Sequence, residues 1–455
     1  MKNARAVDIY KAITDFFTEN NVPYLENLIG FASDGANVMV GANESVMAKL
    51  KIDIPHIFLM KCICHSFALC SSNACAKLPK LVEDCVRNVY NYIANSPKRI
   101  ETLKEFQNFT QTKIHTILHP SQTRWLSLEA VVCRITEQYN ALKLYFIDAA
   151  TNDKLQAAED ILKVLQNPLT LAFLLFLEHI LPLFNNLNRE MQSTEPKLYQ
   201  LHTRMCESYK TLLDYFIKKS TLDNFPLHKI NVKNPENYKP IENMYIGAKL
   251  AQYILNNHLS SEDMHILRVR CLDFYIEAAV QICKRYDFDN VILKSMCLID
   301  PKYISNCQDE SLVPLAVHFP NLVPDKNLQK LDNEWRRLKN SNNFNYDEKV
   351  IAFWLKVQKE KYADETEVYP LLPTFVFSLL SLPHSSADAE RKFFQVNLLK
   401  TKQRNSLSTA TTVGLLHSKE YLKNGECFNL KITDKLLSYH NVKMYNKIQE
   451  FSDSE

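Results

Sequence analysis

Glycine is scarce in this chain, with only 6 among 455 residues. Turn-rich all-β folds and phosphate-binding loops both depend on glycine, because it adopts positive φ without steric cost. The sequence has no Gly-x-Gly-x-x-Gly and no Gly-Lys-Ser/Thr pattern, so nucleotide binding has no support. The apolar fraction of 46% and the charged fraction of 23% are typical of a globular protein, and the length predicts two or three domains.

The apolar pattern near the start of the chain predicts alternating strands and helices. Apolar residues recur at helical spacing from Val7 to Phe17. Leu28 to Ala32 is a short apolar run that predicts a buried strand, and 36–50 returns to a helical pattern. Ile57 to Lys61 predicts a second strand, followed by a helix over 62–76. This order predicts two parallel strands joined by a crossover helix.

Three candidate functional side chains follow these strands. Asp34 comes directly after the first strand, and Cys62 and His65 follow the second. In open sheets of this kind, chemistry lies at the carboxyl ends of the strands. Asp34 either ligates a metal or caps the next helix. The Cys-x-x-His arm lacks a second pair at zinc-finger spacing, so His65 is better explained as a neighbour of Asp34.

A second acidic motif lies near the end of the chain. Ser385 or Ser386 caps a predicted helix that runs to about Leu399, with Asp388 and Glu390 in its first turn. Glu390 either stabilises this helix N-terminus or forms a metal site with the distant carboxylate that follows the first strand. A divalent metal needs such a pair if the fold brings the two carboxylates together.

The middle of the chain is predicted to be almost wholly helical. Its most apolar run, 169–184, contains Glu178, His179 and Pro182 and is short for a bilayer span. It therefore predicts a buried helix and no membrane contact. The N-terminus does not resemble a signal peptide, so the 12 cysteines are expected to be reduced thiols.

Basic residues are unevenly distributed, although the net charge is only +3. Residues 61–124 include nine basic and four acidic residues, and residues 391–419 include six basic residues and no acidic one. Segments of this kind either contact phosphates or form solvated helix faces. Charge pattern alone leaves both interpretations open.

Taken together, the motifs resemble those of the hAT (hobo/Activator) superfamily of transposases and the host proteins derived from them. The resemblance runs over nearly the whole chain in order. The matching segments are Ser33 to Asn37 for the second catalytic Asp, Cys62 to His65 for the Cys-x-x-His motif, Thr123 to Trp125 for the Arg-Trp motif, Phe176 to Gln192 for the start of the helical insertion, and Ser385 to Phe394 with Arg404 to Leu407 for the C-terminal dimerisation region with the catalytic Glu.

The resemblance implies a mainly α protein with a small α/β part. It predicts a truncated ribonuclease-H-like domain, with its first strands missing, interrupted by a large all-helical insertion. The corresponding parts are 1–128, the helical insertion 129–365, and 366–455 with the dimerisation region. The family's first catalytic Asp and its zinc finger have no counterpart in this sequence.

The resemblance also implies the site residues and the function. Asp34 and Glu390 would be the remnant catalytic and metal-binding pair, while Cys62, His65, Arg124 and Trp125 would contact DNA, the last by stacking on a base. We expect an inactive derivative without a cofactor; Mg²⁺ or Mn²⁺ would serve any activity that remains. It would act in the nucleus, and also in the cytoplasm, through homodimers or higher oligomers and residual DNA contact. The alternative is an incomplete copy of an active metal-dependent transposase.

Overall fold

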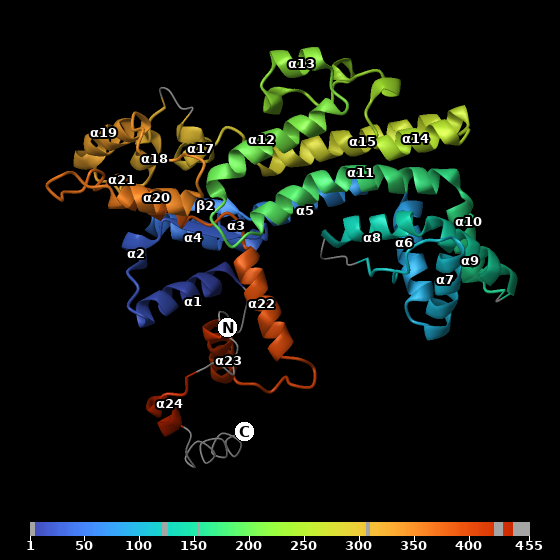
Figure 1. The fold of residues 1–455 in the computed structure, drawn as a ribbon, viewed down its shortest axis with the longest axis horizontal. Coiled ribbons are helices and arrows are strands. Elements are labelled where there is room, and N and C mark those ends of the chain that lie inside the picture. Colours follow the sequence, from blue (N-terminus) through green and yellow to red (C-terminus); the bar gives the residue numbers. More distant parts are fainter. Residues whose placement is uncertain (1–4, 121–125, 153, 306–309, 423–430, 440–455) are drawn as a thin grey trace. The chain divides into compact units, whose positions relative to one another are not determined.

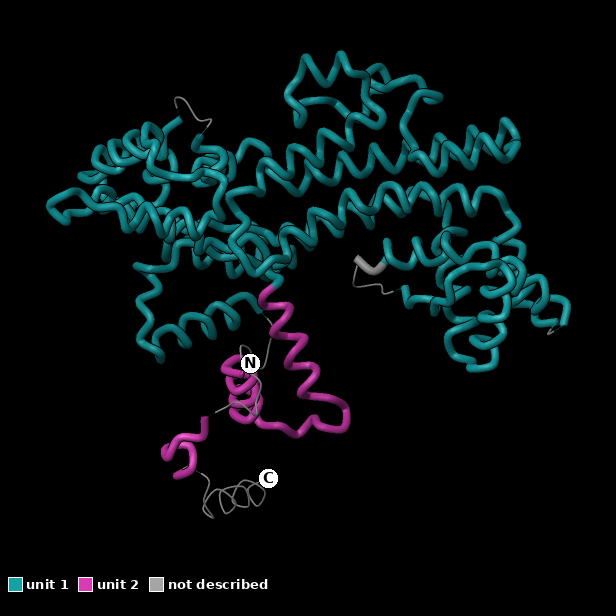
Figure 2. The backbone as a smooth tube through the Cα atoms, viewed as in Figure 1, with its two compact units in different colours: residues 1–387 teal, residues 388–455 magenta. Residues whose placement is uncertain are grey.

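The computed structural model describes residues 5–120, 126–152, 154–305, 310–422 and 431–439. The chain divides into two compact units, residues 1–387 and 388–455 (Figure 2). Both predicted boundaries of the helical insertion, at 128 and 365, fall inside the first unit, and the three-part division stays a prediction.

Helices dominate the described residues, so the predicted class of a mainly α protein with a small α/β part is confirmed (Figure 1). The N-terminal elements are α1 (Ala6–Glu19), α2 (Tyr24–Asn27), β1 (Gly30–Ser33), α3 (Asn37–Val40), α4 (Val46–Asp53), β2 (Phe58–Lys61) and α5 (Ile63–Cys75). The next helices are α6 (Lys80–Ile93), α7 (Pro97–Phe109), α8 (Leu126–Glu137), α9 (Tyr139–Asn152), α10 (Gln156–Gln166), α11 (Pro168–Met191), α12 (Leu198–Asp214), α13 (Lys219–Asn224), α14 (Ala248–Asn256) and α15 (Ser261–Arg285).

The remaining helices complete the first unit and make up the second. They are α16 (Val291–Ser295), α17 (Pro301–Ile304), α18 (Val313–His318), α19 (Leu328–Lys339), α20 (Val350–Lys359), α21 (Leu372–Leu380), α22 (Ala387–Leu399), α23 (Thr409–Tyr421) and α24 (Asp434–Tyr439). Short 3₁₀ helices are η1 (Leu227–Lys229), η2 (Pro235–Asn237), η3 (Ile241–Asn243), η4 (Met296–Ile299) and η5 (Asp325–Asn327).

The two strands form a parallel pair, as the sequence predicted. The register runs from Gly30 opposite Phe58 to Ser33 opposite Lys61. The strand after α2 was predicted over 28–32 and as buried; it lies over 30–33 instead, and only its last residue is fully buried. The prediction of burial was therefore wrong for most of this strand.

Each face of the sheet packs against a different hydrophobic cluster. Phe31 and Leu59, which are opposite each other, pack against the small cluster that includes residues of α1 and α4. Phe58 and Met60 point to the other face and belong to the main core. The sheet is therefore sandwiched between two apolar layers, which a parallel pair requires.

One helix prediction near β1 was wrong. The sequence predicted a continuous helix over 36–50, but the structure has α3 and α4 with a break between them. At the end of α3, a Cβ on Gly41 would lie 2.6 Å from the Asn37 carbonyl oxygen. The Ser45 side chain then accepts a hydrogen bond of 3.1 Å from Ala48 N and so begins α4. A new N-cap therefore replaces the predicted continuation.

The long apolar helix is buried, as predicted. α11 is long and apolar enough to cross a membrane by length and composition, but most of its apolar side chains lie in the core. It packs beside α5 and α15 within the first unit (Figure 1). Burial against other helices explains its hydrophobicity.

The chain returns to the sheet just before the second unit. α21 is apolar and buried, and Glu334 accepts hydrogen bonds of 3.0 and 2.9 Å from the first amides at its start, those of Leu371 and Leu372. Leu382 and Pro383 then contact β1, because a Cβ on Gly30 would lie 2.6 Å from Leu382 Cδ2 and 3.1 Å from Pro383 Cδ. Most apolar side chains of α21 are buried within the chain.

Substituting Gly30 tests this contact. We expect Gly30→Ala to lower the free energy of unfolding by about 1–3 kcal/mol, because the added methyl group overpacks against a buried leucine. The matched control is Gly35→Ala, where the nearest atom to the new Cβ is 4.0 Å away; its effect should stay within about 0.5 kcal/mol. Urea unfolding measures both, and equal stabilities would contradict the contact.

Candidate functional site

The candidate site lies at the carboxyl ends of β1 and β2. The amide of Cys62 donates a hydrogen bond of 2.7 Å to Ser33 O, which extends the ladder one step beyond the strands. A Cβ on Gly35 would lie 4.0 Å from His65 Cδ2. The turn that carries Asp34 therefore lies beside the first turn of α5, as the parallel pairing predicted.

Asp34 shapes the turn after β1. Its Oδ1 accepts hydrogen bonds from Ala36 N at 3.2 Å and from the Ser33 hydroxyl at 3.4 Å. This is an Asx turn, in which the side chain replaces a backbone acceptor. Among the residues that the structure describes, the second oxygen, Oδ2, has no hydrogen-bond partner, and the residue is exposed. One oxygen thus supports the turn while the other is available to a ligand.

Cys62 is the N-cap residue of α5 and is almost completely buried. Its sulfur accepts a hydrogen bond of 3.3 Å from the amide of Ser386, 324 residues further along the chain. A hydrogen bond from the Cys64 thiol, opposed by burial and supported by Ser386, lowers the pKa of Cys62 to about 5. Thiols at helix N-termini often have such lowered values, because the amides there stabilise the thiolate.

The segment before α22 is the third contributor. Ser385 Oγ accepts a hydrogen bond of 3.4 Å from the amide of Ala387, where α22 begins. Just before it, buried His384 lies 3.3 Å from Ser193 O through Nε2. Asp388 and Glu390 lie in the first turn of α22, as predicted. Through its amide, Ser386 of the second motif therefore reaches the carboxyl end of β2.

Some predicted site residues are not brought together by these contacts. Arg124 and Trp125 lie outside the described residues. Asp34 belongs to the first unit and Glu390 to the second, so their proximity stays a prediction. His65 is exposed next to the Asp34 turn.

The possible metal-ligand atoms at the carboxyl ends of β1 and β2 include a carboxylate and a thiolate. A carboxylate suits Mg²⁺ or Mn²⁺, whereas a thiolate suits softer metals. In the described parts of the chain, no group of three or more His, Cys, Asp or Glu side chains is arranged to hold a metal ion. Asp34 alone does not make a Mg²⁺ site, because these ions need several oxygen ligands.

Two backbone contacts of the site were missed by reasoning from the sequence. The amide of Ser386 binds the Cys62 sulfur, and Cys64 Sγ lies 3.8 Å from Asn188 O on α11. Ser386 was predicted to cap a helix and to belong to the dimerisation region, and its main-chain contact with Cys62 was not predicted. Backbone donors and acceptors carry no side-chain signature, so the adjacent motifs were the sole signal in the sequence.

A search against protein-family models found no model that matches this chain.

The lowered pKa of the Cys62 thiol predicts how the free energy of unfolding depends on pH. The native pKa of Cys62 is about 5, below the ordinary value of 9.0, so the unfolded chain binds more protons between these values. The free energy of unfolding should therefore rise with pH across this window, by at most about 1.4 kcal/mol per pH unit. This contribution is complete above pH 9 and is lost as the pH falls toward 5.

Cys62→Ser is the matching variant. Urea unfolding across this pH window should show a smaller rise for Cys62→Ser than for the unsubstituted chain. Ultraviolet thiolate absorbance gives a direct check, since the difference between the two proteins should titrate near pH 5. A difference that titrates near the ordinary thiol value would contradict the assignment.

Proposed function

We propose that this chain is a protein derived from a hAT-type transposase, acting by self-association and DNA contact in the nucleus without cleaving DNA. β1 and β2 would be part of a ribonuclease-H-like sheet, and the central helices would be its insertion. The main supporting observation is that residues of three motifs lie close together at the carboxyl ends of β1 and β2. These residues are Asp34, Cys62 with His65, and Ser386.

The expected lack of cleavage follows from the resemblance. Two-metal strand cleavage needs carboxylates that hold both ions. The resemblance assigns two residues of this sequence, Asp34 and Glu390, to a catalytic site that has three carboxylates in the family. These two would be the metal ligands, and the metals would supply an activated water. His65 beside Asp34 would then remain as a polar contact for DNA.

Incubation with DNA tests this part of the proposal. The 455-residue chain should neither nick nor join a labelled transposon-end or hairpin substrate in Mn²⁺. Asp34→Ala should behave like the unsubstituted chain, because there is no metal-dependent step to lose. Nicking that disappears in Asp34→Ala would show that the chain is an active enzyme and would favour the incomplete-transposase alternative.

Self-association is supported by the second unit. The described helices α22 and α23 carry large exposed apolar side chains: Phe393 is 68% exposed, Leu398 56% and Tyr421 78%. Lys392 on α22 forms an ion pair of 2.6 Å with Glu420 on α23. Several exposed apolar side chains on one small unit are typical of an interaction surface. The basic segment 391–419 would lie in the same unit and could face DNA phosphates.

Surface substitutions test self-association without removing the core. We expect Phe393→Ser combined with Leu398→Ser to weaken self-association by roughly tenfold or more, since buried apolar anchors dominate interface energies. Leu255→Ser on α14 is the control, because Leu255 is 80% exposed but lies in the first unit. Sedimentation equilibrium measures the change. A monomeric unsubstituted chain at micromolar concentration would contradict self-association.

A further inference from the structure

β2 has a free edge. It pairs with β1 on one side, and the sheet contains no third strand among the described residues. Both faces are covered, because Leu59 packs with the small cluster and Phe58 and Met60 pack in the main core. The outer edge is therefore the one side of β2 that a new chain segment could reach.

The backbone of this edge has unused hydrogen-bonding groups. Phe58 N donates to Ile29 O at 2.9 Å and Cys62 N donates to Ser33 O at 2.7 Å. In a parallel ladder alternate residues face the partner strand, so the amides and carbonyls of Leu59 and Lys61 point away from β1. No hydrogen bond of these four groups occurs within the described part of the chain.

A cavity of about 540 Å³ opens along this edge. All four residues of β2 line it, together with the segment 283–290 and Leu293. Side chains alternate between the faces of a strand, so a wall of four consecutive residues is an edge and not a face. Ile63 and Phe288 are apolar residues that also line the cavity, and both are largely buried.

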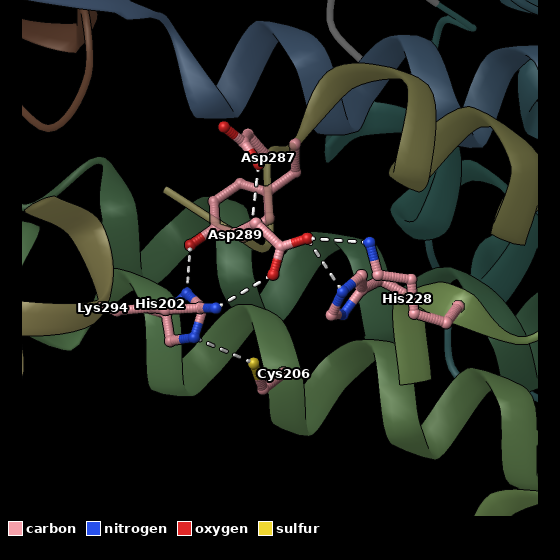
Figure 3. A network of polar contacts seen from close by, with 8 residues as sticks. His202, Cys206, His228, Asp287, Asp289 and Lys294 are labelled. Atoms are coloured by element: carbon pink, nitrogen blue, oxygen red, sulfur yellow. Dashed lines mark hydrogen bonds and ion pairs between the residues drawn. The ribbon is translucent and has the colours of Figure 1, made fainter. Parts of the chain in front are cut away.

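Charged side chains of both signs line the cavity. Two carboxylates, on Asp287 and Asp289, are also present, but Asp289 is already bound (Figure 3). Its oxygens lie 3.0 Å from Lys294 Nζ, 3.1 Å from Lys229 Nζ and 3.1 Å from His228 Nε2. The cationic side chains that line the cavity and take no part in these ion pairs are Lys61, Lys284 and Arg285.

We propose that an extended acidic segment of a partner protein binds here and adds to the free edge of β2 as a third strand. The backbone of the segment would bond to Leu59 and Lys61, as in other cases of β-strand addition. Acidic side chains of the segment would face Lys61, Lys284 and Arg285.

The chemistry of the edge favours a peptide over its competitors. An edge alternates donors and acceptors, and a peptide supplies both. DNA phosphates are acceptors, so they would bind the cations but leave the carbonyls of Leu59 and Lys61 without donors. A second copy that paired through its own β2 edge would bring the same cations together, and like charges repel.

Substitutions at Lys61 separate the backbone from the charge. The probe is a short fluorescein-labelled peptide in which valine and glutamate alternate, added to the full chain and followed by fluorescence anisotropy. Lys61→Ala removes the exposed ammonium and keeps the amide, so we expect about twofold to threefold weaker binding. Lys61→Pro removes the ammonium and also the backbone N–H that points away from β1, while every hydrogen bond to β1 is kept. We therefore expect peptide binding to weaken roughly tenfold further.

Methylated peptides give a second test that does not depend on the folding of a variant. In an extended peptide, alternate amides point to opposite edges of the strand. One peptide carries N-methyl groups on the odd-numbered amides and a second carries them on the even-numbered amides, so each peptide has one edge blocked. Only one of the two methylation patterns should abolish binding. Hydrogen exchange at Leu59 and Lys61 should slow when the unmodified peptide is added.

Four outcomes would overturn the proposal. These are no binding up to roughly 1 mM peptide, equal losses in Lys61→Ala and Lys61→Pro, equal effects of both methylation patterns, or displacement of the peptide by duplex DNA. The last result would assign this surface to nucleic acid. None of these tests depends on the proposed descent from a transposase.

Discussion

The hydrogen bond from Cys62 N to Ser33 O carries the parallel ladder beyond the end of the two strands. Everything at the candidate site depends on this continuation, because it holds the start of α5 beside the turn after β1. A sheet of two parallel strands has little stability by itself. The covering layers on both faces, one around α4 and one in the main core, supply the apolar contacts that keep the pair in register.

The elements that could be predicted are those with strong local signals. The parallel pair followed from two short apolar runs separated by a helical pattern, and α11 followed from the apolar run over 169–184, which also contains Glu178, His179 and Pro182. Ser408 caps α23 with a hydrogen bond of 3.1 Å from Thr411 N, and a serine before a helical pattern is a reliable signal. Asp34 at a strand end was likewise accessible to this reasoning.

The elements that could not be predicted depend on tertiary contacts or on competing local signals. The break between α3 and α4 lies over the mostly polar segment 41–45, where Ser45 caps a new helix, although the apolar residues on either side fit one helical pattern. The approach of Leu382 to Gly30 and of Ser386 to Cys62 joins residues more than 300 positions apart, and no pattern in one sequence encodes such a distance. The free edge of β2 is also invisible in the sequence, since pairing on one side leaves no mark on composition.

The contact between Ser386 and the Cys62 sulfur has a consequence for how this position can evolve. The donor is a main-chain amide, which nineteen of the twenty standard residues supply equally, and proline alone lacks. Drift of the side chain at 386 would therefore leave the thiolate contact intact. The constraint would act as the exclusion of a single residue type, so the identity of residue 386 in related chains would be a poor guide to the importance of the bond.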